Sequence, residues 1–220
     1  MEDVILCWSG GKDSALALER LRQSGRYRAA SLLTTVTEDY DRVSMHGVRW
    51  VLVERQAAAL GLSLQPVRIP AGCVNAQYEE RMGAAMAHAH GQGIELVAFG
   101  DIFLEDVRHY RESNLARAGM RGVFPLWKLP SAELGREFLR LGFQAVVVVV
   151  DANKLERSFA GRAYDAAFLR DLSAGVDSCG ENGEFHTFVF DGPGFRAPVT
   201  FHVGEIVLRD AFYFCDLLPA

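Results

Sequence analysis

Six consecutive residues near the N-terminus have the types and the order needed to hold nucleotide phosphates. They are Ser9-Gly10-Gly11-Lys12-Asp13-Ser14, between a short apolar run and a segment with leucines at helical spacing. Two glycines let the backbone approach a polyanion, and amides at the start of the following helix point towards it. Ser9 and Ser14 add hydroxyl donors, and Lys12 adds a positive charge. The sequence therefore predicts a phosphate-binding loop at residues 9–14.

This loop differs from the Walker loop of kinases and switch GTPases. The residue five before Gly11 is Leu6 rather than glycine, and Lys12 is followed by Asp13 rather than serine or threonine. An ordinary tight turn is the alternative interpretation, because glycine is frequent in turns. All six residues together, between a strand and a helix, favour a nucleotide loop with ATP as its ligand.

Acidic and imidazole side chains gather in a glycine-rich stretch near residue 180. Glu181, Asn182, Glu184 and His186 precede or begin an expected strand, and a strand starting near Glu184 would project Glu184 and His186 from one face. Such a set can bind Mg²⁺, orient an amine or move a proton from attacking ammonia. His186 is the candidate base, because imidazole titrates near neutrality, and Asn182 is a substrate-binding candidate. A solvated turn with surface charges is the alternative.

Gly100-Asp101 ends the strand expected at residues 96–99. Because ligands bind at the carboxyl ends of parallel strands, both residues are candidates for contact with the nucleotide. Asp101 and Asp13 are also the two candidate ligands for Mg²⁺. A helix cap is the alternative role for Asp101.

Two more candidates for substrate binding follow other expected strands. His46 ends a polar segment, residues 37–46, that could close over substrate as a lid or be only a solvated loop. Glu79 follows the third strand, and a favourable charge near a helix N-terminus explains it equally well. The charged run at residues 105–112 indicates a salt-bridged helix face more than a set of phosphate ligands.

The elements that must position these residues alternate between strand and helix. Such alternation implies parallel strands joined by right-handed crossovers, with helices covering both faces of the sheet. The predicted fold class is therefore α/β, with a doubly wound, mostly parallel, Rossmann-like sheet. Strands are expected at residues 4–8, 29–37, 64–69 and 96–99, and helices at 14–24, 46–60, from Asn75 as a cap, and at 105–118, with Gly25 and Gly61 ending the first two.

The pattern changes in the second half of the chain. Strands at 122–127 and 145–151 flank a helix at 131–141, and a helix at 164–172 precedes antiparallel strands at 185–190, 199–207 and 210–214. We place a boundary near Pro125. Residues 1–125 would form the nucleotide-binding domain, and residues 126–220 a smaller α+β substrate-binding domain. Without a low-complexity linker between them, the two parts are expected to pack tightly.

Composition limits the classes of partner. A net charge of −5 argues against a general nucleic-acid binder, whose phosphate contacts require a basic surface. The four cysteines are widely spaced and indicate reduced thiols rather than a metal or redox pair. No signal-peptide pattern is present, and the apolar runs are too short for a bilayer, so we expect a cytoplasmic protein without a membrane partner. The sequence leaves room for a homodimer.

Several motifs in order carry a resemblance to a known family. The phosphate loop resembles that of the pyrophosphate-loop ATP pyrophosphatases, with an adenine nucleotide alpha hydrolase-like fold. Nearly the whole chain resembles the diphthine–ammonia ligase family, through Gly100-Asp101-Ile102, Pro125-Leu126-Trp127 and Cys179-Gly180-Glu181. This resemblance implies cleavage between the α- and β-phosphates of Mg-ATP, adenylation of a substrate carboxylate, and attack by ammonia to give an amide. Lys12 would stabilise the leaving pyrophosphate.

One departure from the family bears on the acceptor. Asn182 and His186 stand where the eukaryotic and archaeal members have glycine and glutamate, so the chain resembles a bacterial-type branch. That implies an acceptor other than diphthine, for example a small metabolite such as a corrinoid precursor. Two alternative functions are a tRNA-modifying adenylating enzyme and a non-catalytic ATP or AMP sensor. The acidic composition disfavours the first, and the cluster at 181–186 disfavours the second.

Overall fold

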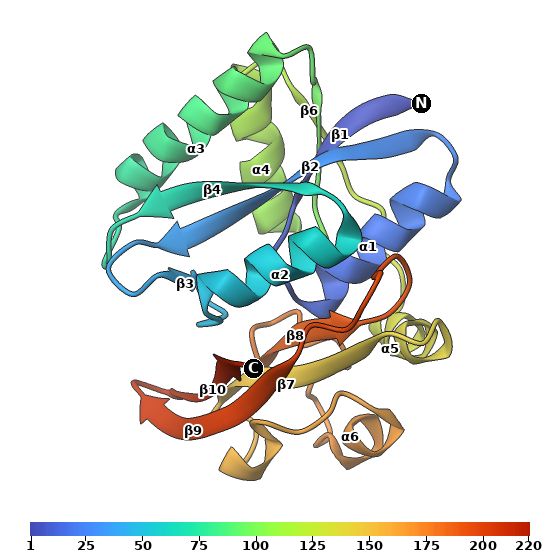
Figure 1. Cartoon of the computed structure of the whole chain (residues 1–220), viewed down its shortest axis with the longest axis vertical. Coiled ribbons are helices and arrows are strands. Elements are labelled where there is room, and N and C mark those ends of the chain that lie inside the picture. Colours follow the sequence, from blue (N-terminus) through green and yellow to red (C-terminus); the bar gives the residue numbers. More distant parts are fainter.

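Two β-sheets form the fold, and two helices lie between them (Figure 1). The computed structural model describes residues 1–220. The parallel strands of the first sheet run in the order β4-β2-β1-β5-β6, and β3 pairs antiparallel with the end of β2. The predicted mostly parallel α/β sheet is therefore confirmed. Its six strands are β1 (Glu2–Cys7), β2 (Tyr27–Thr37), β3 (Arg42–Val43), β4 (Ser63–Ile69), β5 (Leu96–Ala98) and β6 (Arg121–Val123).

Helices cover both faces of this sheet. Figure 1 shows α3 (Asn75–Gly91) and α4 (Glu105–Arg117) on one face, and α1 (Lys12–Gln23) and α2 (Trp50–Leu60) on the other. The apolar run in β1 is continuous because successive side chains of a strand point to opposite faces of the sheet, and both faces are covered here. Val4 and Leu6 join the core that contains α1 and α2, whereas Ile5 joins the core beneath α3 and α4. The sheet is doubly wound, as predicted.

The second sheet is antiparallel and lies against the other side of α1 and α2. Its strands run in the order β8-β7-β10-β9. One core of 40 buried residues continues from the first sheet through α1 and α2 into β7 and β8. The two parts thus pack on each other, while the division at residue 125 stays a prediction. The remaining elements are α5 (Ser131–Arg140), β7 (Gln144–Asp151), η1 (Arg157–Phe159), α6 (Ala166–Asp171), β8 (Phe185–Asp191), β9 (Phe201–Arg209) and β10 (Phe212–Pro219).

The helix predicted from residue 46 is wrong at its start. It begins at Trp50, because residues 44–47 form a tight turn. Met45 and Gly47 have φ angles of 67° and 65°, in the left-handed region that a right-handed helix excludes. Gly61, in contrast, ends α2 in the left-handed conformation that was expected of it, with φ 67°.

Two other expectations also need correction. The strand predicted at 122–127 ends at Val123, and the chain then turns, with the Trp127 amide donating to the Phe124 carbonyl at 3.2 Å. Asn75 does not cap α3. It is the first helical residue, and its amide group donates to Glu79 one turn later.

All four cysteines are free. No helix of the structure combines the length and the apolar character that a bilayer crossing would require.

Candidate functional site

The predicted phosphate loop lies at the carboxyl edge of the first sheet, between β1 and α1. Gly10 has φ 79°, and a β-carbon there would lie 2.8 Å from Oε1 of Gln56, so only glycine fits. Gly11 precedes α1 in extended conformation and provides no side-chain cap. The first-turn amides of α1 are therefore left to other partners or to a ligand, as an anion site at a helix N-terminus requires.

The buried amide of Gln56 holds the loop in place. Its Nε2 donates to the carbonyls of Gly10 and Val189, and its Oε1 accepts from the indole of Trp8 at 2.9 Å. Gln56 was not identified from the sequence, although its position in the helix could have indicated a structural role. This side chain shares the apolar face of α2 with Leu52 and Leu60 and is fully buried, and a polar group in such a place must find hydrogen-bond partners.

Strand β8 of the second sheet also holds the phosphate loop. The Val189 amide donates to the Gly10 carbonyl at 2.9 Å, and the Lys12 amide donates to Oγ1 of Thr187 at 3.0 Å. Thr187 escaped sequence reasoning because its partner lies 175 residues earlier in the chain. The loop is consequently shared between the two halves of the molecule.

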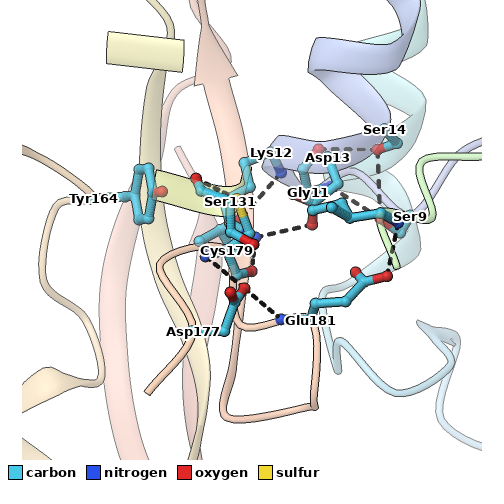
Figure 2. Close-up of polar contacts among 12 residues, drawn as sticks. Ser9, Gly11, Lys12, Asp13, Ser14, Ser131, Tyr164, Asp177, Cys179 and Glu181 are labelled. Atoms are coloured by element: carbon cyan, nitrogen blue, oxygen red, sulfur yellow. Dashed lines mark hydrogen bonds and ion pairs between the residues drawn. The ribbon is translucent and has the colours of Figure 1, made fainter. Parts of the chain in front are cut away.

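Lys12 points into the second half of the molecule rather than out of the loop (Figure 2). It is only 4% exposed, and its ammonium donates to the Cys179 carbonyl and to the Asp13 carboxylate, the latter at 2.8 Å. The rings of Tyr164 and Phe185 flank it, with centroids 5.9 and 5.2 Å away. Burial opposes the charge of Lys12, but Asp13 and the other acidic groups around the ammonium together outweigh burial, so the pKa of Lys12 is raised. Lys12 is thus held in an internal ion pair, and its contact with phosphate stays a prediction.

Glu181 bridges the two halves next to the phosphate loop. Its carboxylate accepts hydrogen bonds from the amides of Ile102, at 2.7 Å, and Phe103, at 3.4 Å, which follow β5. Burial, together with the nearby charge of Asp13, raises the pKa of Glu181 to about 7, although the two amides act in the opposite direction. A carboxyl group with this pKa can exchange a proton near neutral pH.

Glu184 has a different environment from the one expected. It is 3% exposed, and its carboxylate accepts hydrogen bonds from the amides of Asp177 and Asn182 and from the side chain of Asn182. Strand β8 begins at Phe185 rather than at Glu184, so Glu184 folds back into the loop before the strand. The prediction that Glu184 and His186 share one face is wrong, because the carboxylate satisfies the loop amides instead.

His46 and His186 are brought together from distant segments. Their ring centroids are 4.4 Å apart with an angle of 31° between the planes. His46 comes from the tight turn after β3, and His186 comes from β8. Nε2 of His46 lies 3.3 Å from the position that a β-carbon of Gly11 would occupy, so the pair borders the phosphate loop.

Gly100 packs directly against the start of α1. A β-carbon on Gly100 would lie 2.9 Å from the Asp13 carbonyl carbon and 3.0 Å from the Ser14 nitrogen. Asp101 forms an ion pair with Arg111 of α4, with 2.6 Å between carboxylate oxygen and Nε. Both candidate magnesium ligands, Asp13 and Asp101, are therefore paired with cationic side chains.

We expect Gly100→Ala to damage the phosphate loop selectively. The new methyl group must push the first turn of α1 away, which should cost about 1–3 kcal/mol of unfolding free energy and weaken nucleotide binding by at least about tenfold. Gly83→Ala is the matched control, because no atom lies within 4 Å of its β-carbon position in α3. That variant should gain up to about 1 kcal/mol. Urea denaturation and calorimetric titration measure both effects, and equal behaviour of the two variants would contradict the expectation.

Glu79 is not among the residues that gather at the loop. It pairs with Arg117 of α4 at 3.1 Å and accepts from Tyr110 and Asn75. Glu79, Tyr110 and Arg117 line a cavity of about 590 Å³ between α3 and α4. The charged run of α4 contains the Arg108–Glu112 pair, as the predicted salt-bridged face requires.

The site combines an anion-binding helix start with a carboxyl group and two imidazoles. No cluster of three or more metal-ligating side chains is present in the structure. The arrangement can hold a polyphosphate at the loop and accept or donate protons beside it.

Two family models together match most of the chain. The family model for the diphthamide synthase N-terminal domain matches residues 2–122, and the model for the C-terminal domain matches residues 131–217. Among solved structures, the U34-tRNA thiolase NcsA from Methanococcus maripaludis with its iron–sulfur cluster is 16% identical. The TM-score is 0.39, over 64% of this chain and 57% of that one.

The curated relatives described next are diphthine–ammonia ligases, and each is about a quarter identical to this chain. The Rattus norvegicus protein is 26% identical over 233 residues, which cover 95% of this chain and 86% of the relative. The Homo sapiens protein is 25% identical over 231 residues, with the same coverage. The Danio rerio protein is 27% identical over 230 residues, 93% of this chain and 89% of the relative. The chain belongs to the diphthamide synthase family, a family of ATP-dependent ligases.

Proposed function

We propose that this protein joins ammonia to a substrate carboxylate, at the expense of ATP cleaved to AMP and pyrophosphate. The observation that carries the proposal is the meeting of the phosphate loop with the segment at 177–186, which brings Glu181 and His186 to the loop. The diphthine–ammonia ligases among the relatives support both ATP use and ammonia as a substrate.

The reaction has two steps. A carboxylate oxygen attacks the α-phosphorus of ATP, and the bond to the bridging oxygen breaks to release pyrophosphate. Ammonia then attacks the carbonyl carbon of the acyl-adenylate, AMP leaves with the bond to its oxygen, and the new amide loses a proton. The loop amides of residues 9–14 stabilise the charge that develops on the departing phosphates, which is where fixed donors contribute most.

Glu181 and His186 have different roles in this reaction. Glu181, whose pKa is about 7, accepts the proton that the attacking ammonia loses. His186 contacts the phosphates or the adenylate, and Glu184 and Asn182 hold the loop that presents both residues. Lys12 acts by fixing this loop to the start of α1, since its ammonium is bound to the Cys179 carbonyl.

Magnesium enters with ATP as part of the substrate. Asp13 and Asp101 are each engaged by a cation, Lys12 and Arg111, so these carboxylates do not form a ready protein cage. Mg²⁺ keeps several waters and is often held mainly by substrate phosphates. ATP therefore supplies the main ligands in this proposal.

The acceptor is a carboxylate other than diphthine. A cavity of about 800 Å³ adjoins the turn that carries His46, and it is lined by Arg42, Ser44, Met45 and residues of β9 and β10. Charged side chains line its rim, among them Arg42 and Asp216, which pair at 2.8 Å. We place a polar metabolite there, such as a corrinoid precursor.

Purified protein with Mg-ATP, ammonium and a panel of carboxylates tests the proposal. AMP and pyrophosphate should form in equal amounts, and only when an accepted carboxylate is present. Production of ADP, or AMP release that does not depend on ammonium, would contradict it. Tight ATP binding without AMP formation from any acceptor would favour the sensor.

A further inference from the structure

A turn with an unusual backbone conformation holds His46 against His186. His46 is presented by a turn in which Met45, a non-glycine residue, adopts φ 67°. Such a conformation is unfavourable for a residue with a β-carbon, and the surrounding structure must maintain it. Met45 itself is 75% exposed, so packing of its side chain does not explain the turn. The turn positions the imidazole that follows it.

One nitrogen of the pair lacks a partner in the protein. Nδ1 of His46 is buried and makes no hydrogen bond of good geometry, although the Ser44 backbone acts on this ring, while Nε2 of the same ring faces Gly11 of the phosphate loop. Unsatisfied buried polar atoms are rare and call for an explanation, which a ligand or a proton received at this place would give. The pair therefore borders the loop with unused hydrogen-bonding capacity.

The surroundings keep both imidazoles neutral in the free protein. Burial lowers the pKa of His46 well below its usual range, and His186 and Lys12 act in the same direction, while the Ser44 backbone opposes it. Burial and Lys12 lower the pKa of His186 to about 4. The carboxylate at the start of α1, that of Asp13, is paired with Lys12. Phosphate oxygens arriving on the loop would reverse this balance, because nearby negative charge favours the protonated imidazole.

We propose that His46 and His186 form a phosphate-contacting pair, which takes up a proton when a nucleoside triphosphate occupies the loop and then donates a hydrogen bond to its phosphates as an imidazolium. The two rings share one proton, because two touching imidazolium ions repel each other. The proton comes from the solvent. This role rests on the proposed function, since it requires that residues 9–14 bind nucleotide phosphates.

Calorimetric titration of the full chain with Mg-ATP tests the pair. The titration is run near pH 7.5 in buffers with different heats of ionisation, and the dependence of the binding heat on the buffer gives the number of protons taken up. We expect about one proton per nucleotide in the natural protein, because the coupled pair titrates as a unit. Affinity should fall as the pH rises through the pKa of the complexed pair.

Variants separate the pair from other sources of protons. His46→Gln and His186→Gln keep a hydrogen-bonding side chain but cannot hold a proton, so each should abolish the uptake and weaken binding by about tenfold. His202→Gln, on the exposed part of β9, is the matched control and should bind with the same uptake as the natural protein. Uptake that persists unchanged in both site variants would overturn the proposal.

Imidazole nuclear magnetic resonance on the natural protein gives a test without variants. The signals of two of the six histidines should shift together towards the protonated form when Mg-ATP is added, because the two rings share one proton. Tight binding with no change in any histidine would overturn the role of the pair and leave the proposed function standing. Absence of any binding would overturn both.

Discussion

Lys12→Met is expected to lower the free energy of unfolding by about 3 kcal/mol and to abolish amide formation. The methionine fills the apolar space between Tyr164 and Phe185, but it leaves the Asp13 carboxylate and the Cys179 carbonyl without the ammonium. Removing the buried ammonium is costly because the Asp13 carboxylate, whose side chain is 30% exposed, stays partly desolvated without its partner. Urea denaturation and the AMP assay measure the two effects.

The double variant Lys12→Met/Asp13→Asn provides the control. Because the amide carries no charge, the double variant should be more stable than Lys12→Met alone. A loss below about 1 kcal/mol in the single variant, or simple addition of the two single losses, would show that the ion pair is not the cause. Full activity of Lys12→Met would remove the lysine from the proposed mechanism.

Glu181→Gln is expected to have opposite effects on stability and on activity. The pKa of Glu181 is raised from 4.5 to about 7 in the folded protein, so between these values the folded state retains a proton that the unfolded state has lost. Stability therefore falls as the pH rises through this window. Glutamine cannot ionise, and the variant should be more stable than the natural protein by about 1–2 kcal/mol above pH 7, a value reduced for partial solvent screening.

The same substitution should reduce turnover by about 100-fold, because the base that receives the ammonia proton is lost. In the natural protein, turnover should rise with pH through about 7, as Glu181 loses its proton. Unfolding measured between pH 4 and pH 8 should show no difference between variant and natural protein at the acid end. Glu54→Gln, on the exposed face of α2, is the control for removal of a carboxylate. A stability difference that does not change with pH would contradict the prediction.

Local patterns in the sequence predict the elements that carry the site. The apolar run of β1, the glycines and the leucines of α1 lie next to each other, so periodicity alone predicts a strand, a loop and a helix. The same reasoning placed the start of a helix at residue 46, which is wrong. The left-handed conformation of Met45 prevents it, and methionine as a residue type does not predict that conformation. Periodicity also predicted a strand as far as residue 127, because the residues after Gly122 are apolar. The strand ends at Val123, where the chain turns.

The site itself depends on contacts between distant segments, which the sequence does not reveal. His46 and His186 were both candidates, but their contact arises only when the second sheet packs against α1 and α2. Lys12 was expected at the phosphates because of its charge, and nothing in the sequence indicates its contact with the Cys179 carbonyl, which lies 167 residues later. Glu184 illustrates the same limit, because the amides of its own loop compete for the carboxylate.

The hydrogen bonds from β8 to the phosphate loop have a consequence for the order of events during synthesis. Gly10 and Lys12 leave the ribosome early, but their partners Val189 and Thr187 follow only after most of the chain has been made. Such long-range contacts form late in folding, so we expect the phosphate loop to reach its final conformation only after β8 has been made. A bound nucleotide then stabilises both sheets together, and its dissociation lowers the free energy of unfolding of the whole molecule.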